Sequence, residues 1–144
     1  MPEAVFDTSF LHTANGPYSG QKNSSALNRR LTAIRGVNSG HSRVRYNDKL
    51  LAEYSNSLKV HRNDVIEQFI ELLDSKKAIR LPSSTLRHAD KAKANECRWP
   101  THDQHVLAAA VGGSGVVIHV TENALGACAK KVKRIFGIKI NHVV

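Results

Sequence analysis

The chain has 144 residues, 41% of them hydrophobic, and its 21 Lys and Arg outnumber 12 Asp and Glu, which leaves a formal net charge of +9. This length suits a single domain, residues 1–144, with a buried core. No apolar run approaches the roughly 18 residues that a membrane-spanning helix needs, and two cysteines are too few to staple a secreted domain, so we expect a cytoplasmic protein without a membrane partner. The positive charge favours a polyanion, above all a nucleic acid, as the partner.

Strands and helices are expected to alternate through the first half of the chain. Short apolar runs indicate strands, and apolar residues at three- and four-residue spacing indicate helices. In chain order we expect a strand at Glu3–Asp7, a loop at His12–Asn23, a helix from Ser24 to Gly36, a half-exposed strand at Ser42–Tyr46, and helices at Asn47–Leu58 and Asn63–Asp74.

The second half of the chain continues this alternation. The expected segments are a short strand at Ala78–Leu81, an irregular basic segment at Ser83–Pro100, a helix that begins after Thr101 and ends at Gly112, a buried strand at Val116–Val120, a helix at Asn123–Phe136, and a last strand at Ile138–Asn141. Strands that alternate with helices predict an α/β fold with a mostly parallel sheet and right-handed crossovers.

Four acidic residues fall at the ends of these elements or on faces that lean inward. Asp7 closes the first strand, Glu53 lies in the middle of a helix, Asp103 lies in the first turn of another helix, and Glu122 follows the buried strand. Ligands of open α/β sheets bind in the crevice outside the carboxyl ends of the strands. Mg²⁺ and Mn²⁺ prefer oxygen ligands, so carboxylates from separate elements predict a divalent metal site that activates water against a phosphodiester.

Each acid taken alone has a simpler explanation. Asp7 could cap a turn, Asp103 could interact with a helix dipole, and Glu53 could pair with Lys49 one helical turn away. These explanations do not account for the acids' common position where the ligand crevice should be, so the metal site is favoured.

Two other groups of polar side chains have different expected roles. The hydroxyl groups of Thr8, Ser9 and Thr121 are expected to hold turn geometry or to form hydrogen bonds with the metal ligands. His102 and His105 are three residues apart and could share a helix face, but zinc needs further ligands and no partner pair is visible in the sequence.

Four short segments carry the acidic residues together with their neighbours. They are Asp7-Thr8-Ser9-Phe10-Leu11, Leu50-Leu51-Ala52-Glu53-Tyr54, Asp103-Gln104-His105-Val106-Leu107-Ala108-Ala109-Ala110 and Val120-Thr121-Glu122-Asn123. Their order, their spacing and the elements on which they are expected to lie resemble those of the PIN-domain (PilT N-terminus-like) nucleases. The resemblance covers nearly the whole chain and depends on the joint order of the segments.

The resemblance implies a three-layer α/β/α sandwich with a mostly parallel sheet of four or five strands, and metal-dependent cleavage of RNA, commonly single-stranded. Asp7, Glu53 and Asp103 match the family's acidic residues and would bind Mg²⁺ or Mn²⁺. Many members place an aspartate two residues after the threonine, where this chain has Asn123 with Glu122 beside it. Either residue could complete the site, or three carboxylates could suffice, so the choice between one metal and two stays open.

Basic side chains are expected to hold the RNA strand, because Lys and Arg attract phosphates. The first choices lie in the irregular segment and the others on the half-exposed strand; they are Arg87, His88, Lys91, Lys93, Arg98, Arg43 and Arg45. A basic domain of this size is similar to the toxins of bacterial toxin–antitoxin pairs, which implies a cognate antitoxin protein; we also consider a homodimer. The alternatives are a PIN-like module that binds RNA or protein without cutting, and a structure-specific DNA nuclease.

Overall fold

A five-stranded parallel sheet forms the centre of the molecule, in the order β3-β2-β1-β4-β5. The computed structural model describes residues 1–15, 25–59 and 61–144, so most of the loop expected at 12–23 lies outside the described residues. The strands are β1 (Glu3–Phe6), β2 (Arg43–Tyr46), β3 (Ile79–Arg80), β4 (Val116–Val120) and β5 (Lys139–His142). The predicted parallel α/β fold is confirmed.

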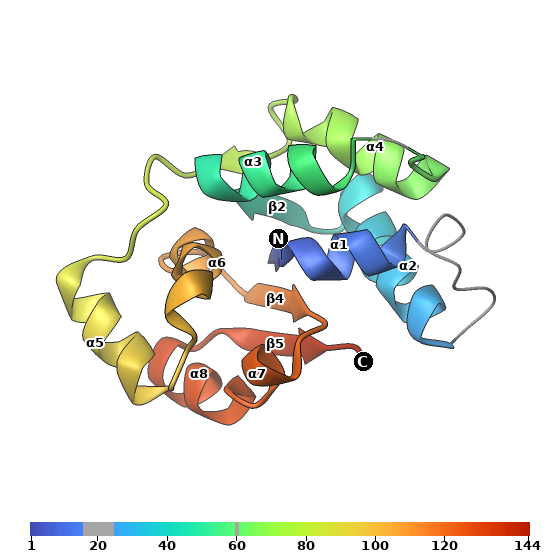
Figure 1. Cartoon of the computed structure of the whole chain (residues 1–144). Helices are drawn as coiled ribbons and strands as arrows, with labels where there is room; N and C mark the ends of the chain where they lie inside the picture. The colour runs from blue at the N-terminus through green and yellow to red at the C-terminus, as the bar shows by residue number, and fades with distance from the viewer. Residues whose placement is uncertain (16–24, 60) are drawn as a thin grey trace.

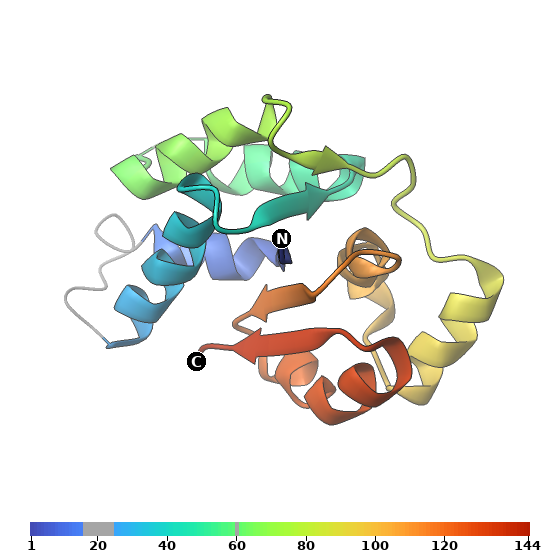
Figure 2. The ribbon, with the colours of Figure 1, turned by 180° about the vertical axis from the view of Figure 1, so that it is seen from behind.

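Helices cover both faces of this sheet and complete a three-layer α/β/α arrangement (Figures 1 and 2). On one face Phe6 of β1 packs its ring against Phe10 and Phe69, and on the other face Arg45 of β2 donates a hydrogen bond to the carbonyl oxygen of Ala109. The first group of helices is α1 (Thr8–Ala14), α2 (Ser25–Asn38), α3 (Asp48–Ser57) and α4 (Asp64–Leu73). The second group is α5 (His88–Glu96), α6 (Gln104–Ala110), α7 (Asn123–Gly126) and α8 (Ala129–Phe136).

Three helical segments differ from the sequence-based expectation. Residues 8–14 form α1, where the expected loop would already have begun at residue 12. The segment expected to be irregular contains α5, and the single helix expected at 123–136 is divided into α7 and α8. Helix α5 escaped the prediction because only Asp90 and Ala94 in it are buried, so it lacks the apolar stripe that marks a helix in a sequence. None of the helices in the described part of the chain is long and apolar enough to cross a membrane.

Strand β2 is an interior strand, and this position corrects the expectation that it is half exposed. It lies between β3 and β1, and Val44, Arg45 and Tyr46 are all buried. The alternation of apolar and basic residues suggested that one face of the strand is exposed to solvent, but both faces of an interior parallel strand are covered by helices.

Strands β1 and β4 position the candidate site. They are parallel neighbours at the centre of the sheet, and the chain leaves β1 towards β2 on one side while β4 lies on the other. The order of the strands therefore reverses between β1 and β4, which is where open α/β sheets form a ligand crevice at their carboxyl ends. The backbone N–H of Asp7 donates to the carbonyl oxygen of His119 over 3.0 Å, so the end of β1 is held against β4.

Candidate metal centre

Asp7 stands at the junction between β1 and α1. Its backbone is extended where the helix begins, and the residue is only 4% exposed. The hydroxyl group of Ser9 donates a hydrogen bond of 2.7 Å to Oδ2 of Asp7, so the first turn of α1 orients the carboxylate. A buried strand thus ends directly in an acid that cannot turn freely away from the crevice.

The surroundings of Asp7 disfavour its negative charge. The pKa of the Asp7 carboxyl is raised from 3.8 to about 6: burial is the main cause, the nearby carboxylates of Glu122 and Asp103 act in the same direction, and the hydrogen bond from Ser9 opposes them. Desolvation and like charges both destabilise an ionised acid. A bound cation would relieve both effects, which is the electrostatic condition that a divalent metal site requires.

Glu53 reaches the same place from α3. Its Oε1 accepts hydrogen bonds from the Thr8 hydroxyl over 2.9 Å and from Nε2 of His105 over 2.8 Å. These contacts replace the pairing with Lys49 that the sequence left open. The next residue, Tyr54, is fully buried and donates its phenolic hydrogen to the carbonyl oxygen of Phe6. Helix α3 is therefore anchored to β1 one residue from the candidate ligand.

Asp103 enters the site at the end of a short 3₁₀ turn, Thr101–Asp103, that leads into α6. The indole N–H of Trp99 donates to the Asp103 carbonyl oxygen over 2.7 Å, and this buried contact holds the turn. The carboxyl oxygen Oδ2 is buried and has no hydrogen-bond partner among the described residues, although Nε2 of His102 lies 3.2 Å away. Burial raises the pKa of Asp103, with nearby His102 and His105 opposing that shift.

Glu122 occupies the fourth position, two residues after the end of β4 and immediately before α7. It is exposed and lines the cavity that Asp7 and Asp103 also line, whereas Asn123, the first residue of α7, is not part of the cavity wall. The sequence left both residues open as ligands, and the geometry favours Glu122. The hydroxyl oxygen of Thr121 accepts a hydrogen bond of 3.3 Å from Arg30, so this side chain contacts α2 and lies outside the lining of the cavity.

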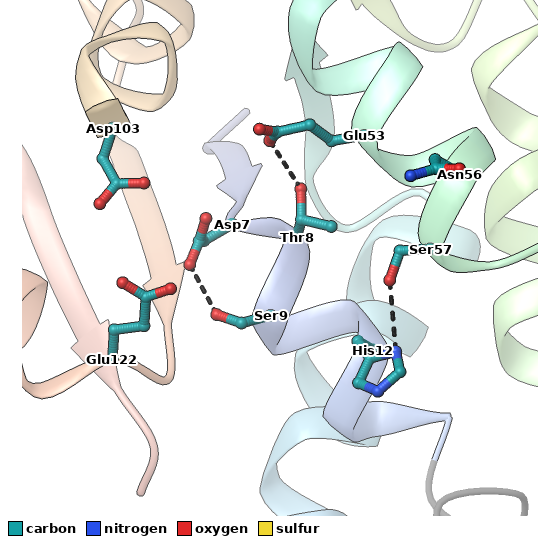
Figure 3. A pocket seen from close by; sticks show the side chains of 9 residues that line it. All are labelled: Asp7, Thr8, Ser9, His12, Glu53, Asn56, Ser57, Asp103 and Glu122. Atoms are coloured by element: carbon teal, nitrogen blue, oxygen red, sulfur yellow. Dashed lines mark hydrogen bonds between the residues drawn. The ribbon is translucent and has the colours of Figure 1, made fainter.

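The four carboxylates converge on one open cavity of about 440 Å³ (Figure 3). In Figure 3, Asp103 and Glu122 lie on one side of Asp7, and Glu53 lies on the other. Oxygen donors from four separate elements, one of them buried and without a hydrogen bond, fit the requirements of a divalent cation. The lining residues are Asp7, Thr8, Ser9, His12, Glu53, Asn56, Ser57, Asp103 and Glu122.

None of the lysines and arginines predicted to bind RNA lines this cavity in the described part of the chain. The side chains of α5 and its flanks are exposed: Arg87, His88, Lys91, Lys93 and Arg98. Arg43 is also exposed at the start of β2. Arg45 is 5% exposed and was predicted wrongly, because its guanidinium is used inside the fold.

Two histidines at the site were missed as partners of the acids, and a third, His12, was missed as part of the cavity wall. The sequence joined His102 to His105, but the structure separates them: Nε2 of His105 faces Glu53, and Nε2 of His102 faces Asp103. His12 lines the cavity and lies 3.2 Å from the Ser57 hydroxyl. The only available signal for the first two was their closeness in sequence to Asp103, which does not reveal the direction of a side chain.

Comparisons with protein-family models, with curated proteins and with solved structures find no match to this chain.

His105 is expected to act on the metal through Glu53. A His105→Leu variant removes the hydrogen bond to Glu53, whereas His105→Gln can still donate from its amide. Loss of a hydrogen bond that orients a metal ligand typically lowers metal affinity by about 10- to 100-fold, so we expect weaker Mn²⁺ binding in the leucine variant and partial rescue in the glutamine variant. Titration calorimetry measures this, and equal Mn²⁺ affinity in all three proteins would contradict the role.

Proposed function

We propose that this protein is a metal-dependent endoribonuclease of the PIN type that hydrolyses single-stranded RNA. The observation that carries the proposal is the convergence of Asp7, Glu53, Asp103 and Glu122 from four elements on one cavity at the carboxyl ends of β1 and β4. The same four residues lie in the segments that resemble those of the PIN-domain nucleases, and three of them, Asp7, Glu53 and Asp103, match the acids of that family. Position in the sheet and order in the sequence thus support the same site.

The proposed chemistry assigns distinct tasks to these side chains. Asp7, Glu53 and Asp103 would hold Mg²⁺ or Mn²⁺, with Glu122 at the edge of the site. When bound, such an ion lowers the pKa of a water ligand and neutralises charge on a phosphate. Ser9 fixes Asp7, and Thr8 and His105 fix Glu53, through the hydrogen bonds described above. These contacts hold the carboxylates in place before the substrate arrives, which lowers the cost of reorganisation.

RNA is the proposed substrate because the chain carries a formal net charge of +9 and an open cavity of acids. A strongly basic surface compensates for the repulsion that a phosphate backbone would meet at the carboxylates alone. The exposed side chains of α5 and its flanks, with Arg43, are the proposed contacts with the strand. We extend the proposal to a cytoplasmic toxin that a protein antitoxin inhibits.

A cleavage assay tests the proposed function. Purified protein is incubated with end-labelled single-stranded RNA in Mn²⁺, in Mg²⁺ or in excess EDTA, with the Asp103→Asn variant in parallel. We expect internal cleavage with either metal, none in EDTA and none by the variant. Equal cleavage in EDTA, cleavage that survives Asp103→Asn, or RNA binding without turnover would overturn the proposal. Preference for a DNA substrate in competition would also overturn it, in favour of a DNA nuclease.

A further inference from the structure

A nitrogen donor stands among the oxygen donors of the site. Nε2 of His102 lies 3.2 Å from Oδ2 of Asp103, and one ligand atom from each of His102, Asp103 and Glu122 lies within 4.8 Å of the others. Three side chains at this separation can converge on one ion with small rotamer changes. The His102 side chain is 81% exposed, so it is free to adjust towards an ion.

The state of Asp103 supplies an independent reason to expect a ligand there. Its side chain is only 10% exposed, and Oδ2 has no hydrogen-bond partner among the described residues. Buried carboxylate oxygens normally accept hydrogen bonds, because an unpaired buried acceptor is costly. Figure 3 shows the Asp103 carboxyl directed towards the space between Asp7 and Glu122. An ion in that space would give this oxygen a partner, because Nε2 of His102 approaches it to 3.2 Å without forming a hydrogen bond.

The chemistry of the three donors discriminates between metal ions. Mg²⁺ takes oxygen ligands and rarely accepts imidazole, whereas imidazole binds well to the later first-row divalent ions. Building on the proposed metal site, we propose that His102, Asp103 and Glu122 form a mixed nitrogen–oxygen position that selects a first-row transition metal ion over Mg²⁺. The zinc interpretation of the sequence lacked partners for His102; the structure places Asp103 and Glu122 there.

This position would differ from the opposite side of the cavity. Glu53 lies on the other side of Asp7 in Figure 3, where its Oε1 is already bonded to Thr8 and His105. Nε2 of His105 is thus occupied by Glu53, and its other ring nitrogen is buried. The imidazole of His12 also lines the cavity, beside Ser57 and away from Asp103 and Glu122, so it is the histidine that the experiments must distinguish from His102.

Metal titrations without RNA test this inference. Calorimetry with Co²⁺ and with Mg²⁺ is run on the wild type, on His102→Gln and on His41→Gln, an exposed histidine between α2 and β2 that serves as a matched control. We expect Co²⁺ affinity to fall by about 10-fold or more in His102→Gln while Mg²⁺ affinity changes less than about 2-fold. The His41 variant should match the wild type. Unchanged Co²⁺ affinity in His102→Gln would overturn the inference.

A spectroscopic readout identifies the donor atom directly. Electron spin-echo measurements on bound Mn²⁺ should show coupling to an imidazole nitrogen in the wild type and in His41→Gln, and none in His102→Gln. Coupling that persists in His102→Gln would assign the nitrogen to another histidine and overturn the inference. An exposed side chain is replaced, so thermal unfolding of the metal-free variants should be equal.

The outcomes separate this inference from the proposed function. If the wild type cleaves RNA and His102→Gln keeps its Co²⁺ affinity, the nuclease proposal stands and the imidazole ligand is wrong. If RNA is never cleaved but Co²⁺ affinity and the nitrogen coupling depend on His102, the ligand assignment stands and the nuclease proposal is wrong.

Discussion

An Asp7→Asn variant is expected to lose metal-dependent RNA cleavage by about 100-fold or more and, at the same time, to be more stable than the wild type without metal. The loss is of the size found when one electrostatic group is removed from a catalytic site. The higher stability of the metal-free variant follows from the pKa of Asp7, which is raised from 3.8 to about 6, chiefly by burial. At pH 7 the ionised carboxylate therefore costs the folded state about 2–3 kcal/mol that a neutral amide does not.

The pH dependence of unfolding in EDTA checks the sign of this effect. Because the folded-state pKa of Asp7 is raised, the favourable contribution of its protonated form is complete below pH 4 and is lost as pH rises through 6. His119 acts in the opposite direction: burial lowers its pKa from 6.5 to about 4, so its contribution is complete above pH 6.5 and is lost towards pH 4. In the wild type, the changes in stability that Asp7 and His119 cause between pH 4 and 6.5 therefore have opposite signs and offset each other.

Without the Asp7 carboxylate, the pH dependence of the unfolding free energy should therefore follow the protonation of His119. The ring of His119 stacks on Phe6 at 4.6 Å between centroids, and protonating it between pH 6.5 and 4 should cost the Asp7→Asn variant about 3 kcal/mol of unfolding free energy. Urea unfolding at pH 4, 5.5 and 7 measures how the unfolding free energy of the wild type and of Asp7→Asn changes with pH. The control is Asp74→Asn, which replaces an exposed acid at the end of α4. An Asp7→Asn protein that is less stable than the wild type at pH 7, or that still cleaves RNA, would contradict these expectations.

An Arg45→Met variant is expected to be destabilised by about 3–5 kcal/mol, although a basic residue on a strand suggested a surface role. The guanidinium donates hydrogen bonds to the carbonyl oxygens of Ala109 at 2.7 Å and Val111 at 3.0 Å, and to Glu3 Oε1 at 2.8 Å. Burial would raise the pKa of Glu3, but the hydrogen bond from Arg45 holds it below its ordinary value. Without Arg45, two carbonyl groups lose this donor, and the Glu3 carboxylate loses its cationic partner while it keeps the hydrogen bond from the backbone N–H of Ser114.

Two further variants test whether the loss of stability in Arg45→Met comes from the buried charge of Arg45. Arg43→Met, on the same strand but exposed, should change the unfolding free energy by less than about 0.5 kcal/mol. Adding Glu3→Gln to Arg45→Met should recover part of the lost stability, because the unpaired carboxylate is removed. Urea unfolding at pH 7 compares all of them, and a cost below about 1 kcal/mol for Arg45→Met would show that the Arg45 guanidinium does not hold β2 against β1 and α6.

Local patterns predicted the elements well wherever a buried face repeats in the sequence. The β-branched run of β4 and the apolar spacing of α4 are visible without coordinates, because burial on one or both faces imposes that periodicity. Helix α5 shows the opposite case: its buried positions are few, and one of them is Asp90. Its place in the fold depends on its packing beside α8, which a local pattern does not encode.

The candidate site was predictable to the level of its acids. Asp7 and Glu122 each end a strand, and parallel strands bring their carboxyl ends to one edge, so their meeting follows from the fold class. The partners of the acids were not predictable. Thr8 and Ser9 are neighbours in sequence, yet one bonds Glu53 and the other bonds Asp7, because consecutive residues of a helix point in different directions.

The sequence by itself determined the alternation of strands and helices, and with it the edge of the sheet at which the acids of this protein gather, because hydrophobic periodicity is a local property of the chain. Only the tertiary structure decided that Arg45 is a buried structural cation and that His102 and His105 turn to different acids. Those outcomes depend on which strand is interior and on the direction of each side chain. Both are set by contacts between residues far apart in the sequence, such as Arg45 with Ala109 and His105 with Glu53.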